Sequence, residues 1–440
     1  MAITASGDAE FGQTGTWSAR TLDVCRVSAI AAAVLAPFST AATSIVVAVF
    51  LISFFVSGAA LHVVSEAFRL PANKGILAFF AILLGSAFLN EEGLRVALAD
   101  LWSWRKLAFL YVALPLFAAE IWKRRLMLAL FWAFVPMLAL SYISLAGWIP
   151  DRIPGMHGVI LTNYSAQGIA FSVGALCGAL MAWRTTGSAR WVYAAISVAF
   201  GINVLFFGAG RTGYLALAGI VVVAAILNGG WRATLASLLG LALLAALAFA
   251  VSPIFKSRLL LAWNEMEHAE EARTETSIGI RVIFAKNAVA LIAERPLLGY
   301  GLGSFKRVYA DYVRARYTGV KATPAGDPHN QYLYVLFEQG ALGLIVFFAM
   351  IASLFATFPR DDYGRMAACI LAAWCLTSVF SSHFRTFPEG HFYAFVVAGF
   401  GAARGREIRR QVASRNGASS DVHNVHRRAA SREVLEYSST

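Results

Sequence analysis

Long uninterrupted apolar runs recur along this chain, and they constrain its fold more than any other feature. A representative run is SIVVAVFLISFFVSGAALHVV, from Ser44 to Val64. A helix needs about 20 apolar residues to cross a bilayer, whose core offers no water to unpaired backbone groups. Transmembrane β-strands would instead alternate apolar and polar residues over about ten positions. The runs therefore predict an all-α polytopic membrane protein.

Composition supports this prediction. The chain is 58% hydrophobic and only 14% charged, with a mean hydropathy of +0.63, whereas a soluble domain carries roughly 25% charged residues. The first 26 residues are mostly polar, so we expect no cleavable signal peptide. The four cysteines have no zinc or redox spacing and are interpreted as small membrane-embedded side chains; they are Cys25, Cys177, Cys369 and Cys375.

The apolar runs predict about twelve spans, interrupted by one long loop. We expect the spans near residues 22–38, 43–61, 75–90, 106–121, 126–148, 160–183, 190–207, 213–228, 232–251, 331–357, 365–382 and 388–403. The chain would then consist of a tail (1–21), nine spans (22–251), a large loop (252–330), three spans (331–403) and a basic tail (404–440) that we expect to be disordered.

Lys and Arg are concentrated in the short connections on one side of the expected spans. Examples are Lys123, Arg124 and Arg125, together with the arginines after residue 404. The positive-inside rule therefore predicts cytoplasmic termini and a loop 252–330 on the opposite side. The net charge of +12 partly reflects this bias and does not require a nucleic-acid partner. We expect the tail arginines to contact anionic lipid headgroups.

Three side chains on the expected outer face could carry chemistry. Arg211, in NVLFFGAGRTGYLALAGI, lies among glycines between two apolar runs; Arg281 begins an expected amphipathic helix that Pro296 stops. His329 and Asn330 stand where the long loop enters a span. Arginine donates paired hydrogen bonds to phosphate oxygens, and a neutral histidine can take a proton from a hydroxyl near pH 7.

Each residue also has a structural interpretation. Arg211 could extend to lipid headgroups, Arg281 could be a helix-surface arginine, and His329 could simply begin a helix. The glycines of GYGLGSF could shape a turn or aim backbone amides at phosphate, and we favour the turn. Asn163, Asn330, His383 and Arg385 are lower-ranked candidates for lining a site. Without an Asp-x-Asp motif or clustered outer carboxylates, we expect no metal.

Two longer segments resemble a known family. RVIFAKNAVALIAERPLLGYGLGSF (Arg281–Phe305), followed by PHNQYLYVLFEQGALGLIVFF, resembles the hallmark region of the bacterial O-antigen ligase and polymerase superfamily. GAGRTGYLAL (Gly208–Leu217) resembles its second arginine motif, and HGVILTNYSAQGIAF (His157–Phe171) is weakly similar to the start of an earlier span. The resemblance extends from about Gly208 to Met350.

The resemblance implies a metal- and cofactor-independent, inverting glycosyltransferase of the GT-C-like type in the bacterial inner membrane, with a periplasmic active site. The donor would be a glycan on undecaprenyl diphosphate, and the acceptor a sugar hydroxyl. In the ligases this acceptor lies on the lipid A-core; in the polymerases it belongs to another lipid-linked repeat unit. His329 would be the base, and Arg211 and Arg281 would bind the diphosphate.

Other functions remain open at this stage. We favour the ligase because a basic loop that could accommodate a phosphorylated core precedes His329, but polymerase and protein O-oligosaccharyltransferase share the motifs. A secondary transporter is the alternative from another class. Transporters tend to place internal repeats and charges near the bilayer midplane, whereas ionisable residues here cluster at the outer ends of spans. The sugar, the linkage and the oligomeric state are not predicted.

Overall fold

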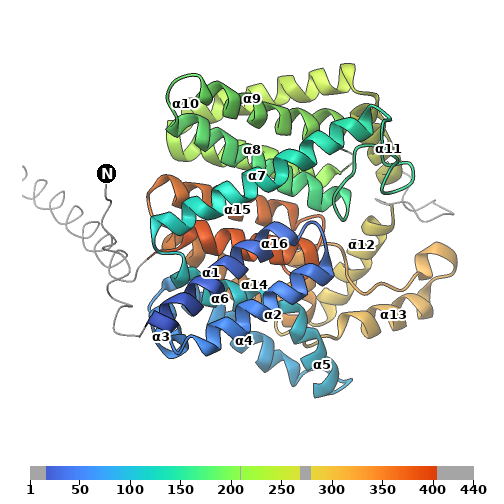
Figure 1. Ribbon diagram of the computed structural model, residues 1–440. Coiled ribbons are helices and arrows are strands. Elements are labelled where there is room, and N and C mark those ends of the chain that lie inside the picture. Colours follow the sequence, from blue (N-terminus) through green and yellow to red (C-terminus); the bar gives the residue numbers. More distant parts are fainter. Residues whose placement is uncertain (1–15, 209, 268–278, 404–440) are drawn as a thin grey trace, which may run out of the picture.

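The computed structural model describes residues 16–208, 210–267 and 279–403, and all regular elements in these ranges are helices (Figure 1). The all-α prediction is confirmed for this part of the chain. The expectations for residues 1–15, for residues 268–278 of the long loop and for the basic tail from residue 404 fall outside the described residues.

The described helices range in length from three to 41 residues. In chain order they are α1 (Thr16–Leu35), α2 (Thr40–Val56), α3 (Ala60–Phe68), α4 (Pro71–Ala87), α5 (Leu94–Leu101), η1 (Trp102–Trp104), α6 (Arg105–Leu116), α7 (Glu120–Leu145), α8 (Tyr164–Arg184), α9 (Ala189–Ile202), η2 (Asn203–Phe207), α10 (Arg211–Val251), α11 (Pro253–Glu267), α12 (Gly279–Glu294), α13 (Phe305–Arg316), η3 (Gly319–Ala322), α14 (Gln331–Thr357), α15 (Asp362–Thr377) and α16 (Phe387–Gly401).

Several helices are long and apolar enough to cross a membrane, so the chain is a multi-pass membrane protein. Within the described residues five helices meet this test: α7, α8, α9 continued through η2, α10 and α14. The pair α2 and α3, bent by 98°, would make a sixth span. Twelve spans stay a prediction, because other apolar helices are short. The 15-residue α16, for example, has nearly every side chain buried against other helices, so it need not match the bilayer thickness.

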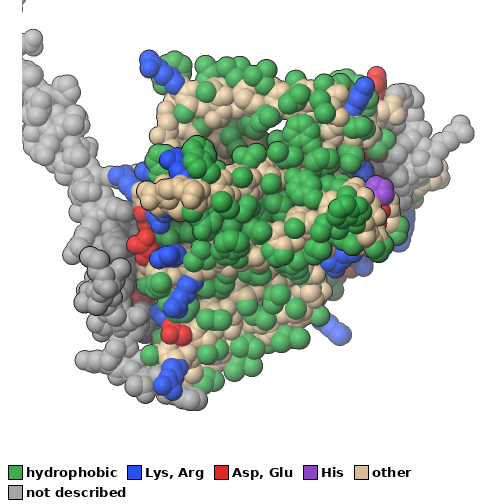
Figure 2. Space-filling model, turned by 45° about the horizontal axis from the view of Figure 1, so that its top comes forward, with side chains coloured by type: hydrophobic (Ala, Val, Ile, Leu, Met, Phe, Trp, Pro, Cys, Tyr) green, Lys and Arg blue, Asp and Glu red, His purple; other side chains and the backbone are tan. Residues whose placement is uncertain are grey.

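The helices of the long loop gather at one end of the bundle. In Figure 1, α11, α12 and α13 lie at the right, whereas α1 begins at the left. Figure 2 shows hydrophobic side chains across the middle of one face, with Lys and Arg mainly toward its left and right margins. This distribution fits a bilayer around the middle of the bundle, with α11 to α13 on one side of it.

The glycine-rich turn after α12 docks onto a break in α14. Gly340 has a left-handed backbone (φ 64°), so the helix is interrupted there. The freed carbonyls of Phe337 and Glu338 accept hydrogen bonds from the backbone N–H groups of Tyr300 (3.0 Å) and Gly301 (2.8 Å). Because protein carbonyls occupy these amides, the turn-forming interpretation of GYGLGSF fits better than phosphate binding.

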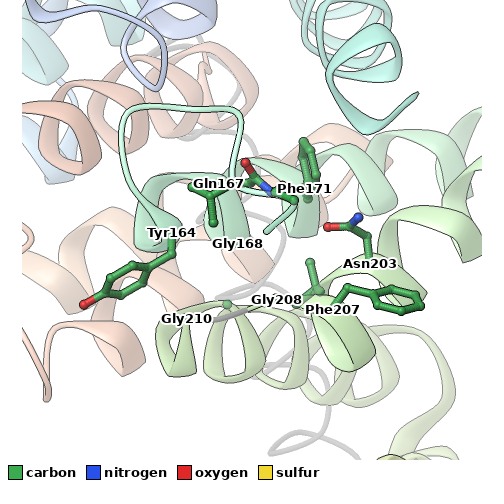
Figure 3. A pocket seen from close by; sticks show the side chains of 12 residues that line it. Tyr164, Gln167, Gly168, Phe171, Asn203, Phe207, Gly208 and Gly210 are labelled. Carbon is green, nitrogen blue, oxygen red and sulfur yellow. The ribbon is translucent and has the colours of Figure 1, made fainter. Parts of the chain in front are cut away.

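Glycines also bring the N-termini of α8 and α10 together. A Cβ on Gly168 would lie 2.6 Å from the Cα of Gly213, so the two helices touch backbone to backbone. A Cβ on Gly210 would lie 2.8 Å from the ring of Tyr164. Figure 3 shows the residues around a small cavity at this contact, with the Tyr164 ring pointing away from Gln167 and Phe171. The contact places Arg211 beside the start of α8.

Candidate active site

One cavity of about 370 Å³ gathers most of the side chains that the sequence singles out. Arg211, Arg281 and His329 all line it, together with Asn163 and His383. These residues come from the starts of α8, α10 and α12, from the residues before α14, and from the connection between α15 and α16. Segments more than two hundred residues apart in the sequence therefore meet at this cavity.

His329 is held in an uncommon backbone conformation. Its φ of 55° is the only positive φ of a non-glycine residue in the described part of the chain. The side chain of Asp327 accepts a hydrogen bond from the His329 N–H (2.6 Å), and the ring stacks on Phe284 of α12 at 6.1 Å. Left-handed non-glycine residues that persist in a structure cluster at functional sites.

Asn330 caps α14 and is not among the residues that line the cavity. Its side-chain oxygen accepts hydrogen bonds from the backbone N–H groups of Tyr332 (2.9 Å) and Leu333 (3.0 Å). Asparagine is a common N-cap residue because its side-chain oxygen can accept from backbone N–H groups at the start of a helix. Asn330 thus fixes where the helix starts, and the left-handed turn before it fixes where the His329 ring points.

The surroundings of His329 favour its neutral form. Burial lowers the pKa of this imidazole below its ordinary value, the Asp327 carboxylate raises it in part, and the Arg281 guanidinium lowers it again. Burial, the largest effect, and the Arg281 guanidinium both penalise a positive charge on the ring, and together they outweigh the Asp327 carboxylate. A neutral ring near pH 7 has one nitrogen free to accept a proton.

Arg211 begins α10 at a helix N-terminus that no side chain caps. Its guanidinium lies 3.9 Å from the Glu265 carboxylate and 3.4 Å from the backbone carbonyl of Arg258. Arg281 lies in the first turn of α12 and lines the same cavity. Helix N-termini and guanidinium groups both favour anions, so this part of the cavity suits a phosphorylated ligand.

The sequence reasoning missed the side chains that α11 contributes. Arg258, Leu261 and Glu265 line the cavity, and their spacing of three and then four residues puts them on one helix face. The sequence analysis assigned this segment to the long loop and singled out none of these side chains. Helical periodicity across residues 253–267 would have exposed this face. Arg258 adds a third guanidinium to those of Arg211 and Arg281.

The side of the cavity next to α8 and α16 is polar. Asn163 caps α8 by accepting a hydrogen bond from the Ala166 N–H (2.7 Å), and its amide donates to the Glu389 carboxylate at 3.4 Å. His383 is only 2% exposed and lies in the same lining. The sequence analysis did not single out Glu389 either. Its position directly after Pro388, in the first turn of a helix, could have marked it as a candidate.

Arg385 lies behind the cavity rather than on its surface. Its guanidinium pairs with Asp100, lies 3.6 Å from Asp327 and sits 3.7 Å above the Tyr334 ring. Arg385 also donates to the Ser103 hydroxyl at 3.0 Å. It thus ties α5, η1 and α14 to the turn that carries His329, and contact with a ligand would require a rearrangement.

The donor set gives no sign of a metal centre. In the described ranges no group of three or more His, Cys, Asp or Glu side chains could hold a metal ion. The carboxylates of the cavity, Glu265 and Glu389, come from different helices, and each has a side-chain partner from another helix. The positive charges that face the cavity are carried by the protein's own arginine side chains.

Comparison with known proteins supports the family resemblance. Residues 196–348 match a family described as O-antigen ligase, which confirms the superfamily resemblance. A protein of Rickettsia conorii named "Putative polysaccharide ligase" is 36% identical to this chain over 80 residues. That alignment covers 18% of this chain and about a fifth (20%) of the relative's length. The family match includes Arg211, Arg258, Arg281 and His329, whereas Asn163, His383 and Glu389 lie outside it.

Proposed function

We propose that this protein is an O-antigen ligase, which transfers a glycan from undecaprenyl diphosphate to a sugar hydroxyl of the lipid A-core. The single observation that carries the proposal is the cavity in which Arg211, Arg281 and His329 converge. The family match over residues 196–348 supports the choice of reaction class. The cavity would face the periplasm of the bacterial inner membrane, with both termini in the cytoplasm.

The proposed reaction is a single displacement. The acceptor oxygen attacks the anomeric carbon, the bond from that carbon to the diphosphate oxygen breaks, and the electron pair leaves with the diphosphate. His329 takes the proton from the attacking hydroxyl, and one displacement inverts the anomeric centre. Diphosphate is already a good leaving group, so the main demand on the protein is to stabilise the growing negative charge.

The arginines meet that demand from three helices. Arg211, Arg258 and Arg281 line the cavity together, and each can give paired hydrogen bonds to diphosphate oxygens. Glu265, beside Arg211, offsets part of the positive charge while the cavity is empty. We propose that the arginines bind the two phosphates and that no metal ion or other cofactor takes part.

A second cavity could receive the start of the prenyl chain. It has a volume of about 360 Å³ and shares Arg258 and Leu261 with the first cavity. Apolar side chains such as Met156, Phe207 and Ile254 line it. A lipid diphosphate bound by the arginines would then have an apolar path beside its charged head, as lipid-binding pockets usually provide.

The first test is substitution of the three predicted residues. We expect His329→Ala to lower glycan transfer by about 10²–10⁴-fold, because general-base help is lost. Arg211→Ala and Arg281→Ala should each lower transfer by at least about tenfold, because charge stabilisation is lost. The assay is glycan attachment to lipid A-core in a deletion strain complemented by each variant, with protein level in the membrane checked. Arg190→Ala, an exposed arginine at the other end of α8 and α9, is the control.

The same strain separates the alternatives. A missing ligase leaves polymerised glycan on undecaprenyl diphosphate, whereas a missing polymerase leaves a single repeat unit on the core. Wild-type transfer by His329→Ala would remove the proposed base. Solute uptake by proteoliposomes without any glycan transfer would instead indicate a transporter.

A further inference from the structure

Part of the cavity carries no arginine and presents neutral or acidic hydrogen-bonding groups instead. We call this part the polar wall and define it as Asn163, Ser165, His383 and Glu389, all of which line the cavity. Asn163 and Ser165 come from the start of α8, and Glu389 from the first turn of α16. Glu389 acts on the pKa of His383 and Asn163 donates to Glu389, so these three residues adjoin, and Ser165 lines the same cavity.

Polar atoms of this wall lack partners within the protein. Both ring nitrogens of His383 and the hydroxyl of Ser165 are buried and have no hydrogen-bond partner among the described residues. Buried polar groups are normally satisfied, because an unpaired one keeps the cost of leaving water and gains nothing in return. His383 is only 2% exposed, yet it faces a cavity large enough for a ligand. These atoms are therefore available to hydrogen-bond a ligand in the cavity.

The chemistry of the wall selects hydroxyl groups over phosphate. Burial lowers the pKa of His383 below its ordinary value, so its neutral ring offers one donor and one acceptor. The serine hydroxyl and the asparagine amide also offer neutral groups, and the Glu389 carboxylate accepts. A carboxylate repels phosphate but accepts readily from a hydroxyl. Alternating donors and acceptors are what the hydroxyls of a sugar ring can satisfy.

We propose that the polar wall binds the hydroxyl groups of a sugar ring while the arginines bind the diphosphate of the same lipid-linked donor. This inference rests on the proposed function. Arg281 acts on the pKa of both His329 and His383, so the base and the polar wall adjoin one arginine. A sugar on the wall would then be attached to a diphosphate at the arginines, and the acceptor hydroxyl would approach beside His329.

The two halves of this site come from different parts of the chain. The arginines and His329 lie within the segment that matches the O-antigen ligase family, whereas the polar wall lies outside it. Under our proposal, diphosphate chemistry and sugar choice are thus carried by separate segments. Changes in Asn163, Ser165 or His383 would alter which glycan is accepted and leave recognition of the diphosphate intact.

Binding to two lipids tests the proposal with the full-length protein in nanodiscs. One lipid is undecaprenyl diphosphate without sugar, and the other is undecaprenyl diphosphate carrying the glycan. We expect His383→Ala and Ser165→Ala to weaken binding of the glycan-bearing lipid by roughly three- to tenfold, the effect of one or two lost hydrogen bonds. Their binding of the sugar-free lipid should not change. Arg258→Ala should weaken both lipids.

Two further variants show whether a loss of affinity reflects the lost hydrogen bonds or a loss of folding. Ser172→Ala is the matched serine control, because its hydroxyl donates to the Gly168 carbonyl (2.7 Å) on the same helix and does not line the cavity. It should leave both affinities unchanged. His383→Gln keeps a donor and an acceptor and should recover part of the lost affinity. If His383→Ala does not fold, Ser165→Ala carries the test, since it removes only one hydroxyl.

The possible outcomes separate this inference from the proposed function. Equal weakening of both lipids by His383→Ala, or no change in either, would overturn the sugar site. No change in either affinity, together with a raised KM for the acceptor, would likewise overturn the donor-sugar site and would assign the polar wall to the acceptor sugar. If the wild-type protein binds neither lipid, the proposed function itself fails.

Discussion

His329 combines strained backbone geometry, partial burial and two nearby charges. The left-handed turn costs conformational energy that Asp327, through its hydrogen bond to the His329 N–H, offsets. Asp327 is in turn fixed by the Ser382 hydroxyl (2.8 Å) and by Arg385 at 3.6 Å. Arg385, expected to line the site, thus acts behind His329 through Asp327.

The pH dependence of transfer should report the ionisation of His329. Transfer should fall as the pH drops through the pKa of His329, because only the neutral ring accepts a proton. The Asp327 carboxylate raises that pKa, so Asp327→Asn should lower it and move the acidic limb to lower pH. Asparagine keeps an oxygen that can accept from the His329 N–H. The measurement is the pH profile of kcat for glycan transfer in proteoliposomes.

An acidic limb that stays in place in Asp327→Asn, or that moves to higher pH, would mean that another group controls the rate. His383, which lines the same cavity, is the first alternative. The double variant Asp327→Asn with His383→Gln would then show whether the limb follows His383.

At the scale of helices, breaks and close contacts decide which side chains meet. The break at Gly340 lets α14 receive the turn after α12. The contact between Gly168 and Gly213 lets the starts of α8 and α10 approach, so Asn163 and Arg211 can line one cavity. Small residues that allow such approach are common between membrane helices.

Gly213→Ala should separate α8 from α10. Its new Cβ would lie 2.9 Å from the Cα of Gly168, and overpacking of this kind typically costs about 1–3 kcal/mol. We expect a lower unfolding temperature in detergent and reduced transfer, because Arg211 moves with its helix. Gly240→Ala is the control, since a Cβ there meets no atom within 4 Å; it should leave both measurements nearly unchanged. Equal effects from the two variants would argue against a specific role for the contact.

At the scale of the whole molecule, the helices of the long loop and the start of α1 lie at opposite ends of the bundle (Figure 1). The cavity is built by α11, by the starts of α8, α10 and α12, and by the connection between α15 and α16. If the ends of the bundle face opposite sides of the membrane, the cavity opens on the side of α12 and α13. The positive-inside rule predicts that this side is the periplasm.

Labelling of single cysteines tests this orientation. Arg316, at the end of α13, and Arg190, in the first turn of α9, are both exposed. In a background without the four native cysteines, a membrane-impermeant maleimide should label Arg316→Cys in intact cells. It should label Arg190→Cys only after the membrane is opened. The reverse pattern would place the cavity in the cytoplasm and exclude the proposed periplasmic reaction.

The sequence by itself determined the class of the protein and the elements around the site. Apolar runs predict membrane helices because hydropathy is a local property of the chain. Pro296 and the following glycines predict the end of α12 and the turn after it, since backbone preferences are also local. Arg211, Arg281, His329, Asn163 and His383 could be proposed because each stands out within its own segment, as an ionisable or capping residue near an apolar run.

Only the tertiary structure decided which of these residues share a cavity. Arg258, Glu265 and Glu389 line the cavity because α11 and α16 fold against it. Local periodicity can mark a helix face, but it does not say what that face packs against. Asn330 instead caps its own helix, and Arg385 pairs behind the cavity. Where a side chain points depends on helix breaks and on contacts between segments distant in the chain. Sequence patterns describe each segment alone, so convergence is settled only when the helices pack.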